Sequence, residues 1–242
     1  MLRASEHDHL RVVLVAPRNP LNMGAAARAM SNFGFLRLRL VSPYDVAFRE
    51  VQSAVGAADL LARAEEYKSV AEAVADCALV VGTTTGRDRD VQHPLHVLEE
   101  GAIILRERLA AAPVAILFGS EKRGLSNEDL SHCQWVMHIP TRDAHVSMNL
   151  GQAVAVCLYE IARGAHISHK IENEPLATAA DLDRITTVLL EALAGSGYLK
   201  PASAAATEEK VRRMIRRLNP SHADAEVLLG MLRQMAWTMR PK

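Results

Sequence analysis

The residues with the clearest chemical potential follow the first apolar run of the chain. In the segment APRNPLNMGAAARAM, Asn22 and Arg28 stand six residues apart, and the residues between them at 24–27 are all small. Small side chains leave one helix face bare, so that a backbone or a ligand can approach it closely. An amide and a guanidinium at this spacing can bind a polar substrate, although a tightly packed helix with a solvated arginine gives the same pattern.

Two further polar segments follow apolar runs. The turn Thr83-Thr84-Thr85-Gly86 comes directly after ALVVG, where hydroxyls and backbone donors suit a polar ligand, although an ordinary threonine-rich turn is an equal alternative. The segment ILFGSEKRGLSNEDL carries two glycines, which indicates a backbone that lies against something flat. Because Leu125-Ser126 replaces Lys-Ser/Thr after the second glycine, and no G-x-G-x-x-G follows the first run, Walker NTPase and Rossmann dinucleotide sites are disfavoured.

A fourth segment, HIPTRDAHVSMNLGQAVAV, presents Ser147 and Asn149 two residues apart just before a helical pattern. Gly151 in that pattern permits close packing against another helix. Taken alone, the segment could equally be an N-terminal helix cap. Its position after an apolar run makes it a candidate for the same site as the other three segments.

Metal sites and disulfides are not indicated. Pairs of the form H-x-x-H begin at His93 and His166, but the chain has no H-E-x-x-H and no cysteines at zinc spacing, so we expect no metal. Cys77, Cys133 and Cys157 lie far apart and form no C-x-x-C pair. We expect them to be core thiols in a reducing compartment.

The candidate segments must be positioned by elements in which short apolar runs alternate with longer patterned stretches. The runs lie at residues 11–16, 36–41, 78–82, 114–118 and 135–140. Because VVLVA, ALVVG and VAILF are continuously apolar, they are predicted to be buried on both faces of a parallel sheet flanked by helices. The fold class is therefore α/β, and its sites are expected at the carboxyl ends of the strands.

Local signals predict several helices. Asn22 is expected to cap a helix that runs through Arg28 to Phe33, and Ser126-x-x-Asp129 has the form of a capping box. Residues 150–161 form a further amphipathic stretch. The character of the chain changes after Gly164, where the apolar runs stop and the polar segment HISHKIENEPLATAA begins.

The chain is therefore predicted to have three parts: a domain at residues 1–164, a linker at 165–180 and a small helical extension at 181–242. Helical spacing occurs in the extension at 181–193, 208–218 and 224–239. The last stretch is expected to place one apolar side together: Val227, Leu228, Met231, Leu232 and Met235. A basic cluster on the middle stretch can bind phosphates, although a solvated basic face is nearly as good an interpretation: Lys210, Arg212, Arg213, Arg216 and Arg217.

Composition limits the class of protein. The 242 residues are 49% hydrophobic and 23% charged, which is enough apolar material for one ample core or for a domain with an appendage. The 28 basic and 28 acidic side chains cancel, so that any RNA site must be a local patch. The N-terminus has no apolar signal region, and no apolar run approaches the roughly 18 residues of a membrane span. We therefore expect a cytoplasmic protein without a membrane segment.

In their order, the four segments resemble the TrmH-like branch of the SPOUT methyltransferases. The chain contains R-N-P-x-N-x-G-x-x-x-R, a threonine-rich turn, F-G-x-E-x-x-G-L-S-N-E and I-P-T followed by S-x-N-L. The resemblance covers nearly the whole chain, and the helical tail is similar to that of bacterial members that methylate the ribose of tRNA nucleotide 32. Ser120, Lys122-Arg123 and Met148 depart from the common pattern, but none removes a functional group.

The resemblance implies a parallel sheet with a C-terminal trefoil knot, a homodimer with a site shared between subunits, and S-adenosylmethionine as the cofactor. The implied cofactor-binding residues are Thr83, Thr84, Thr85, Gly86, Gly119, Ile139, Ser147, Met148 and Asn149. The implied catalytic residues are Arg28, Asn22, Glu121, Ser147 and Asn149. The implied RNA-binding residues are Arg18, Arg28, Arg87, Lys122, Arg123, Arg212, Arg213 and Arg216.

The reaction that the resemblance implies is methylation of the ribose 2′-hydroxyl at nucleotide 32, a C or U in the tRNA anticodon loop. Arg28 is then either the general base, although an arginine pKa above about 12 makes the neutral form scarce, or a clamp on an RNA phosphate. Two alternatives to a tRNA enzyme are open at this point. One is a methyltransferase of rRNA ribose with the same fold, and the other is an RNA-binding factor without catalysis.

Overall fold

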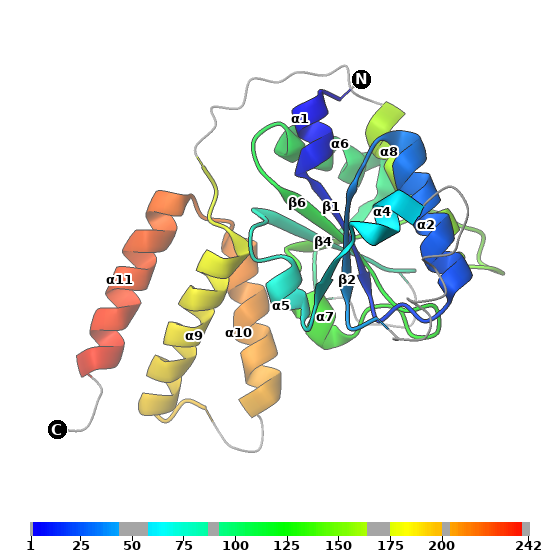
Figure 1. Cartoon of the computed structure of the whole chain (residues 1–242). Helices are drawn as coiled ribbons and strands as arrows, with labels where there is room; N and C mark the ends of the chain where they lie inside the picture. The colour runs from blue at the N-terminus through cyan, green and yellow to red at the C-terminus, as the bar shows by residue number, and fades with distance from the viewer. Residues whose placement is uncertain (1, 44–57, 87–91, 164–174, 200–203, 239–242) are drawn as a thin grey trace.

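Seven parallel strands form the sheet at the centre of the core (Figure 1). In the computed structural model, which describes residues 2–43, 58–86, 92–163, 175–199 and 204–238, the strand order is β3-β2-β1-β6-β4-β7-β5. The strands are β1 (Leu10–Val15), β2 (Arg37–Val41), β3 (Glu65–Tyr67), β4 (Leu79–Thr83), β5 (Leu95–Val97), β6 (Val114–Phe118) and β7 (Trp135–His138). The predicted α/β class with a parallel sheet is confirmed, and the trefoil crossing stays a prediction.

The central strands are buried on both faces, as their continuous apolar runs predict. In β1, Val12 and Leu14 join one hydrophobic cluster, whereas Val13 and Val15 join the cluster on the other face. Successive side chains of a strand point to opposite faces, so both faces of β1 need a covering layer. The same alternation divides β6, in which Ile116 faces the first cluster.

Helices cover both faces of the sheet (Figure 1). The helices of the core are α1 (Ala4–His9), α2 (Pro20–Phe33), α4 (Ala58–Ala62), α5 (Val70–Ala73), α6 (Leu98–Leu109), α7 (Asn127–Ser131) and α8 (Leu150–Arg163). The first cluster takes buried residues from α2, α6 and α8, and the second takes them from α5 and α7.

The start of α2 differs from the prediction. Asn19, not Asn22, is the N-cap residue, and its Oδ1 accepts a hydrogen bond from the backbone N–H of Leu21 at 2.9 Å. Pro20 follows at the first helical position, where its missing N–H costs nothing. Asn22 thus lies within the first turn, and its side chain is available to the site. The capping box at Ser126 is confirmed, because its hydroxyl accepts from the Asp129 N–H at 3.1 Å.

The small residues of α2 admit a neighbouring helix. A Cβ atom added to Gly151 at the start of α8 would lie 2.5 Å from the Cβ of Ala25, which is closer than two carbon atoms can approach. The predicted close approach to the 24–27 segment is therefore made by the backbone of α8 and not by a ligand. This packing holds the first turns of α8 beside α2, and Asn22 and Asn149 at the starts of the two helices are hydrogen-bonded to each other.

The C-terminal extension consists of α9 (Ala179–Gly195), α10 (Ala204–Leu218) and α11 (His222–Thr238), with α9 in the middle (Figure 1). The three helices share a hydrophobic cluster of their own. Two backbone hydrogen bonds tie α9 to the core, from Ala179 N to the Cys77 carbonyl at 2.7 Å and from Ala180 N to the Ala75 carbonyl at 3.1 Å. The extension therefore contacts the core, although its predicted limits as a separate part stay a prediction.

The predicted apolar side of α11 is only partly buried. Leu232 is buried and Leu228 is half-buried against α9. The other three residues of that side are exposed: Val227 to 61%, Met231 to 50% and Met235 to 52%. The apolar residues of α11 span more than one helix face, and only contacts within the folded chain decide which face is buried.

The thiols are buried, as predicted, and Cys77, Cys133 and Cys157 form no disulfide. Burial raises the pKa of Cys157 to about 12, so that its thiol stays protonated at neutral pH. Within the described residues, no helix has the length and apolar character that a membrane crossing requires.

Candidate functional site

A cavity of about 300 Å³ opens at the carboxyl ends of β4, β6 and β7. Its volume is at the lower end of the range of about 300–1,000 Å³ that is typical of small-molecule sites. Three loops form most of its wall: residues 83–85 after β4, residues 119–125 after β6 and residues 146–148 before α8. Three of the four candidate segments therefore meet at one edge of the sheet.

Most of the predicted cofactor-binding residues line this cavity: Thr83, Thr84, Thr85, Gly119, Ile139, Ser147 and Met148. Gly86 and Asn149 are not part of the lining. Sequence reasoning missed the apolar part of the wall: Phe118, Leu125, Leu130, Met137, Val146 and Leu150. These side chains look like ordinary core residues in the sequence, and the only signal is their place at strand ends and around the two loops.

The threonine turn after β4 uses its hydroxyls to hold itself in place. The Thr83 hydroxyl donates to the Leu117 carbonyl at 2.8 Å, and the Thr84 hydroxyl oxygen accepts from the Gly86 N–H at 3.3 Å. The Thr84 N–H donates to the carbonyl of Met137 in β7 at 2.9 Å. The turn is thus tied to both neighbouring strands, and a ligand in the cavity meets a preformed wall.

The loop after β6 folds back on its own backbone. A Cβ atom added to Gly119 would lie 2.0 Å from the carbonyl carbon of Gly124, and Gly124 itself has φ 66°. The Gly124 N–H donates to the Ser120 carbonyl at 2.8 Å, which closes the loop. The flat object that the two glycines predicted is therefore the loop backbone itself. Only glycine permits this closure at Gly119.

Glu121 in this loop receives three hydrogen bonds from the start of α2. Its carboxylate accepts from the Asn22 side-chain amide at 3.0 Å, the Asn19 N–H at 3.1 Å and the Arg18 N–H at 3.3 Å. Partial burial by itself would raise the pKa of Glu121, but these donors outweigh it and hold the pKa below its usual value. A negative charge at the N-terminus of α2 is also favoured by the helix dipole.

The hydrogen bonds continue from Asn22 to the start of α8. The Asn149 side-chain amide donates to Asn22 Oδ1 at 2.7 Å. Asn149 Oδ1 accepts from the backbone N–H groups of Gly151 at 2.9 Å and Gln152 at 3.3 Å, as an N-cap side chain does. Glu121, Asn22 and Asn149 therefore join three segments that are distant in sequence, and only Glu121 of the three lines the cavity.

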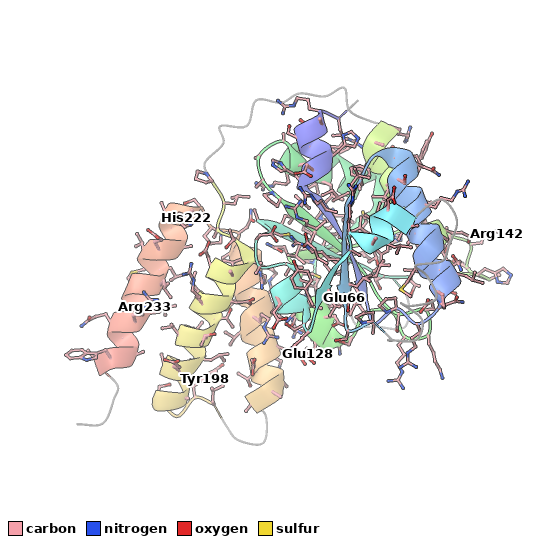
Figure 2. All side chains as sticks on the ribbon, viewed as in Figure 1. Glu66, Glu128, Arg142, Tyr198, His222 and Arg233 are labelled. Atoms are coloured by element: carbon pink, nitrogen blue, oxygen red, sulfur yellow. The ribbon has the colours of Figure 1, made fainter. Side chains whose placement is uncertain are left out.

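Basic residues belong to the cavity wall and to exposed segments near it. Lys122 and Arg123 belong to its lining, and the exposed Arg18 lies beside Glu121 through its backbone. Arg142, which sequence reasoning did not select, projects from the exposed loop between β7 and α8, on the side of the core opposite the extension (Figure 2). Predicted Arg87 lies outside the described residues.

Arg28 is exposed on α2 and does not line the cavity. It lies seven residues after Leu21, which is 81% exposed, and a spacing of seven places both side chains on one stripe of the helix. Asn22 and Arg28 therefore do not point to a common ligand within one chain. A role of Arg28 in chemistry requires a substrate that extends beyond the cavity or a second subunit.

The arginines of α10 that were predicted to bind RNA contact the protein instead. The Arg216 side chain is fully buried and pairs with Asp183 of α9, from Nη2 to Oδ1 at 2.7 Å. Arg213 is 8% exposed, and Arg212 is half-buried with one guanidinium nitrogen on Ser131. A side chain without exposed surface cannot touch an RNA phosphate, so the prediction is wrong for Arg216 in this arrangement. The Arg212 and Arg213 side chains are likewise hydrogen-bonded within the protein, Arg212 to Ser131 and Arg213 to Gln92.

No group of three or more histidine, cysteine or acidic side chains gathers in metal-binding geometry in the parts of the chain that the structure describes. His93 and His132 are instead buried near the α10 arginines. Burial, reinforced by Arg213 and Arg217, lowers the pKa of His93 to about 4. Burial, reinforced by Arg212 and Arg216, lowers the pKa of His132 to about 3.

Known proteins are similar to this chain over most of its length. The model of the SpoU rRNA Methylase family matches residues 9–159. The tRNA (cytidine/uridine-2'-O-)-methyltransferase TrmJ of Sodalis glossinidius is 32% identical over 241 residues, 97% of this chain and 94% of that protein. The tRNA (cytidine/uridine/adenosine-2'-O-)-methyltransferase TrmJ of Pseudomonas aeruginosa is 36% identical over 93% of each chain. The crystal structure of TrmJ from Z. mobilis ZM4 is similar with a TM-score of 0.82 and 32% identity, over 93% of this chain and 98% of that one.

Proposed function

The chain belongs to the SpoU rRNA Methylase family, and we propose that it methylates the 2′-oxygen of a ribose in the anticodon loop of tRNA, at nucleotide 32, with S-adenosylmethionine as the methyl donor. Membership confirms the family predicted from the four segments. The proposal rests above all on two observations. The cavity is built from three of those segments, and the chain is similar over nearly its full length, extension included, to relatives that bear the name of tRNA 2'-O-methyltransferases.

The residues around the cavity fit this cofactor. S-adenosylmethionine combines a purine and a ribose with a charged amino acid group, and the wall combines apolar side chains such as Leu125 and Ile139 with turn backbone and the Ser147 side chain. The threonine turn, the loop 119–125 and the segment 146–148 would hold it. When bound, the cofactor supplies a methyl group already activated on a sulfonium.

The task of the protein is then to position the ribose and to assist loss of the 2′-hydroxyl proton. Alignment of two reactants can contribute several kcal/mol to lowering the barrier, on the order of 7–11 in well-oriented systems. Glu121, Asn22 and Asn149 act as positioning residues, because their mutual hydrogen bonds hold the loops that form the cavity. Lys122 and Arg123 at the opening suit the RNA phosphates, since a cationic side chain gains most next to the polyanion.

Arg28 acts on the RNA from a second subunit in this proposal. It stands outside the cavity of its own chain, on the same stripe of α2 as the exposed Leu21. The neighbouring surface of α8 carries Tyr159, 53% exposed, whose ring lies 6.1 Å from that of Phe33. Apolar side chains exposed on two adjoining helices favour a homodimer through this face, with the site shared between subunits.

A tRNA substrate is favoured over rRNA because the similarity to the tRNA enzymes extends through α9, α10 and α11, beyond the segment 9–159 that the family model matches. A 2′-hydroxyl acceptor excludes DNA, and a single-stranded loop exposes its ribose best. The cytoplasm is the compartment expected for an enzyme of this substrate and for a protein with three free thiols.

The proposal is tested by incubating the purified protein with methyl-labelled S-adenosylmethionine and either unmodified tRNA or unmodified rRNA. We expect label in tRNA alone, and a 2′-O-methylated nucleoside on digestion. Label in rRNA alone would establish the sibling activity that the family name describes. Cofactor binding without transfer to either RNA would contradict the enzymatic assignment.

A further inference from the structure

Hydrogen bonds from helix α10 reach two places on the core, one of which adjoins the candidate cofactor site. The first is Ser131 at the end of α7, whose hydroxyl oxygen accepts from Arg212 Nη1 at 2.9 Å. The second is Gln92, whose side-chain oxygen accepts from Arg213 Nη2 at 2.8 Å and whose carbonyl accepts from Arg217 Nη1 at 3.3 Å. Three arginines of α10 are thus used to attach the extension to the core.

The first contact point adjoins the wall of the cavity. Ser131 follows Leu130, which lines the cavity and packs on β4 so closely that a Cβ atom added to Gly82 would lie 2.7 Å from its Cδ2. Ser131 also donates to the Glu128 carbonyl at 2.6 Å, which couples it to the single turn of α7. A displacement of the Arg212 side chain would therefore be transmitted through Ser131 to Leu130 in the cavity wall.

The second contact point belongs to the connection between the threonine turn and β5. Gln92 is the first described residue after the turn Thr83–Gly86, and β5 begins three residues later at Leu95. His93, next to Gln92, is 8% exposed and packs near Arg213. Arg213 and Arg217 of α10 thus hold the segment that leads into β5.

Docking of the extension carries an electrostatic cost, because it buries polar atoms that lack hydrogen-bond partners. Arg216 Nε and Nη1, His132 Nδ1 and His93 Nε2 are buried without a hydrogen-bond partner among the described residues. Buried cationic groups with incomplete pairing are costly, and a network of this kind stabilises less than its number of charges suggests. Docking of the extension is therefore a balance between its favourable contacts and this cost. Small contributions from the neighbouring loops can shift that balance.

We propose that α10 is a positioning element of the cofactor site, and that attachment of Arg212, Arg213 and Arg217 to Ser131 and Gln92 strengthens cofactor binding. The proposal deepens the proposed function and depends on it. By thermodynamic linkage, the effect is reciprocal: whatever the docked extension adds to cofactor affinity, the bound cofactor adds to docking. The arginines that sequence reasoning assigned to RNA would act on the methyl donor instead, before any RNA is present.

The test measures S-adenosylmethionine affinity by calorimetry on the full chain, without RNA. Arg212→Ala and Arg213→Ala each remove a contact from α10, and we expect dissociation constants raised about 5-fold or more, at the lower end of typical coupling between sites. Arg213→Lys, which can donate one hydrogen bond to Gln92, should recover part of the affinity. The matched control is Arg233→Ala on α11, because Arg233 is exposed and points away from α9 (Figure 2).

A second measurement covers the case in which a variant loses its fold. In the unaltered protein, adding S-adenosylmethionine should slow hydrogen exchange of the α10 amides, although α10 does not line the cavity. Equal affinity in the arginine variants and the Arg233 control, or unchanged exchange in α10, would overturn the positioning role. No binding to the unaltered protein would instead overturn the proposed function, so the two failures can be told apart.

Discussion

Glu121, Asn22 and Asn149 act as a unit. Their hydrogen bonds connect the start of α2, the loop after β6 and the start of α8. Oxygen atoms of Glu121 and Asn149 also accept hydrogen bonds from backbone N–H groups at the starts of the two helices. A carboxylate that accepts three hydrogen bonds and has a lowered pKa is a weak base. In the proposed function, the role of Arg28 in proton removal is therefore the one to measure first.

Arg28→Ala is expected to lower tRNA methylation by about 10²-fold or more, the size of a typical acid–base or orienting contribution. Cofactor affinity should not change, because Arg28 does not line the cavity. Turnover with tRNA and calorimetry with the cofactor alone measure the two effects. Substantial turnover in Arg28→Ala would exclude both proposed roles.

The variant Arg28→Lys distinguishes the two proposed roles of Arg28, a general base and a clamp on an RNA phosphate. The lysine pKa of about 10.4 is below that of arginine, so a base at this position would move the rise of the pH–rate profile to lower pH. A phosphate clamp would lose bidentate contact, which weakens tRNA binding and leaves the profile in place. The comparison needs only KM and kcat for tRNA across pH.

At this level, the sequence predicts many of the residues that line the cavity, among them the threonine turn and Ser147. It could not assign partners, because a hydrogen bond such as that between Asn22 and Asn149 joins positions 127 residues apart. Asn19 was overlooked as the N-cap, although it satisfies the same preference, because both asparagines are followed by helix-compatible residues.

The close packing of α8 against α2 depends on one glycine, Gly151. Gly151→Ala should destabilise the protein by about 1–3 kcal/mol, since its new Cβ would overlap Ala25 and force the two helices apart. Gly230→Ala on α11 is the matched control: a Cβ there meets open space, and we expect a gain of roughly 0.5–1 kcal/mol from helix propensity. Denaturant unfolding measures both. Equal effects at the two positions would contradict the close packing.

The attachment of α10 should depend on pH. His93 and His132 stay neutral in the folded protein down to pH values of about 4 and 3, whereas an unfolded imidazole gains its proton near 6.5. Stability is therefore fully present above pH 6.5 and falls as the pH decreases below it, because the unfolded state then binds more protons. Each histidine costs about 1.4 kcal/mol per pH unit in this window.

This effect is measured by the thermal midpoint and by proteolysis of the extension between pH 7 and 5. We expect both to show loss of docking, and His93→Gln with His132→Asn to flatten the dependence. A midpoint that stays constant from pH 7 to 5 in the unaltered protein would show that the imidazoles are not held neutral at this interface.

The elements themselves were predicted unevenly. Central strands such as β6 were found because burial on both faces leaves a continuous apolar run. The edge strands β3 and β5 were missed, since three residues with partly exposed side chains carry no such run. The basic face of α10 was assigned to RNA because periodicity shows that a helix has a charged face, but not that this face packs on the same chain.

For the whole molecule, a formal net charge of zero does not mean that the charges are evenly distributed. Lys122, Arg123 and Arg18 lie at the cavity, whereas Arg213 and Arg216 are buried between the core and the extension. A neutral chain can therefore present a local basic surface to RNA at the cavity. The fold class followed from the sequence, whereas the side of the core that receives the extension did not.

The proposed homodimer makes a further prediction. Tyr159→Glu places a charge on the exposed face of α2 and α8, and we expect it to shift the protein to a monomer and to lower methylation at least tenfold, since a charge in an apolar interface is costly without a partner. Tyr198→Glu is the control, because Tyr198 is 67% exposed beside the end of α9, within the extension (Figure 2). Light scattering distinguishes the states, and a dimeric, active Tyr159→Glu would exclude this interface.

In the proposed function, the methyl acceptor is the 2′-oxygen of tRNA nucleotide 32. Two otherwise identical tRNAs, one of which carries a 2′-deoxyribose at that nucleotide alone, test this acceptor. With labelled S-adenosylmethionine, we expect stoichiometric transfer to the first tRNA and none to the second. Equal transfer to both tRNAs would contradict it, because the methyl group would then reside on a base or on another ribose.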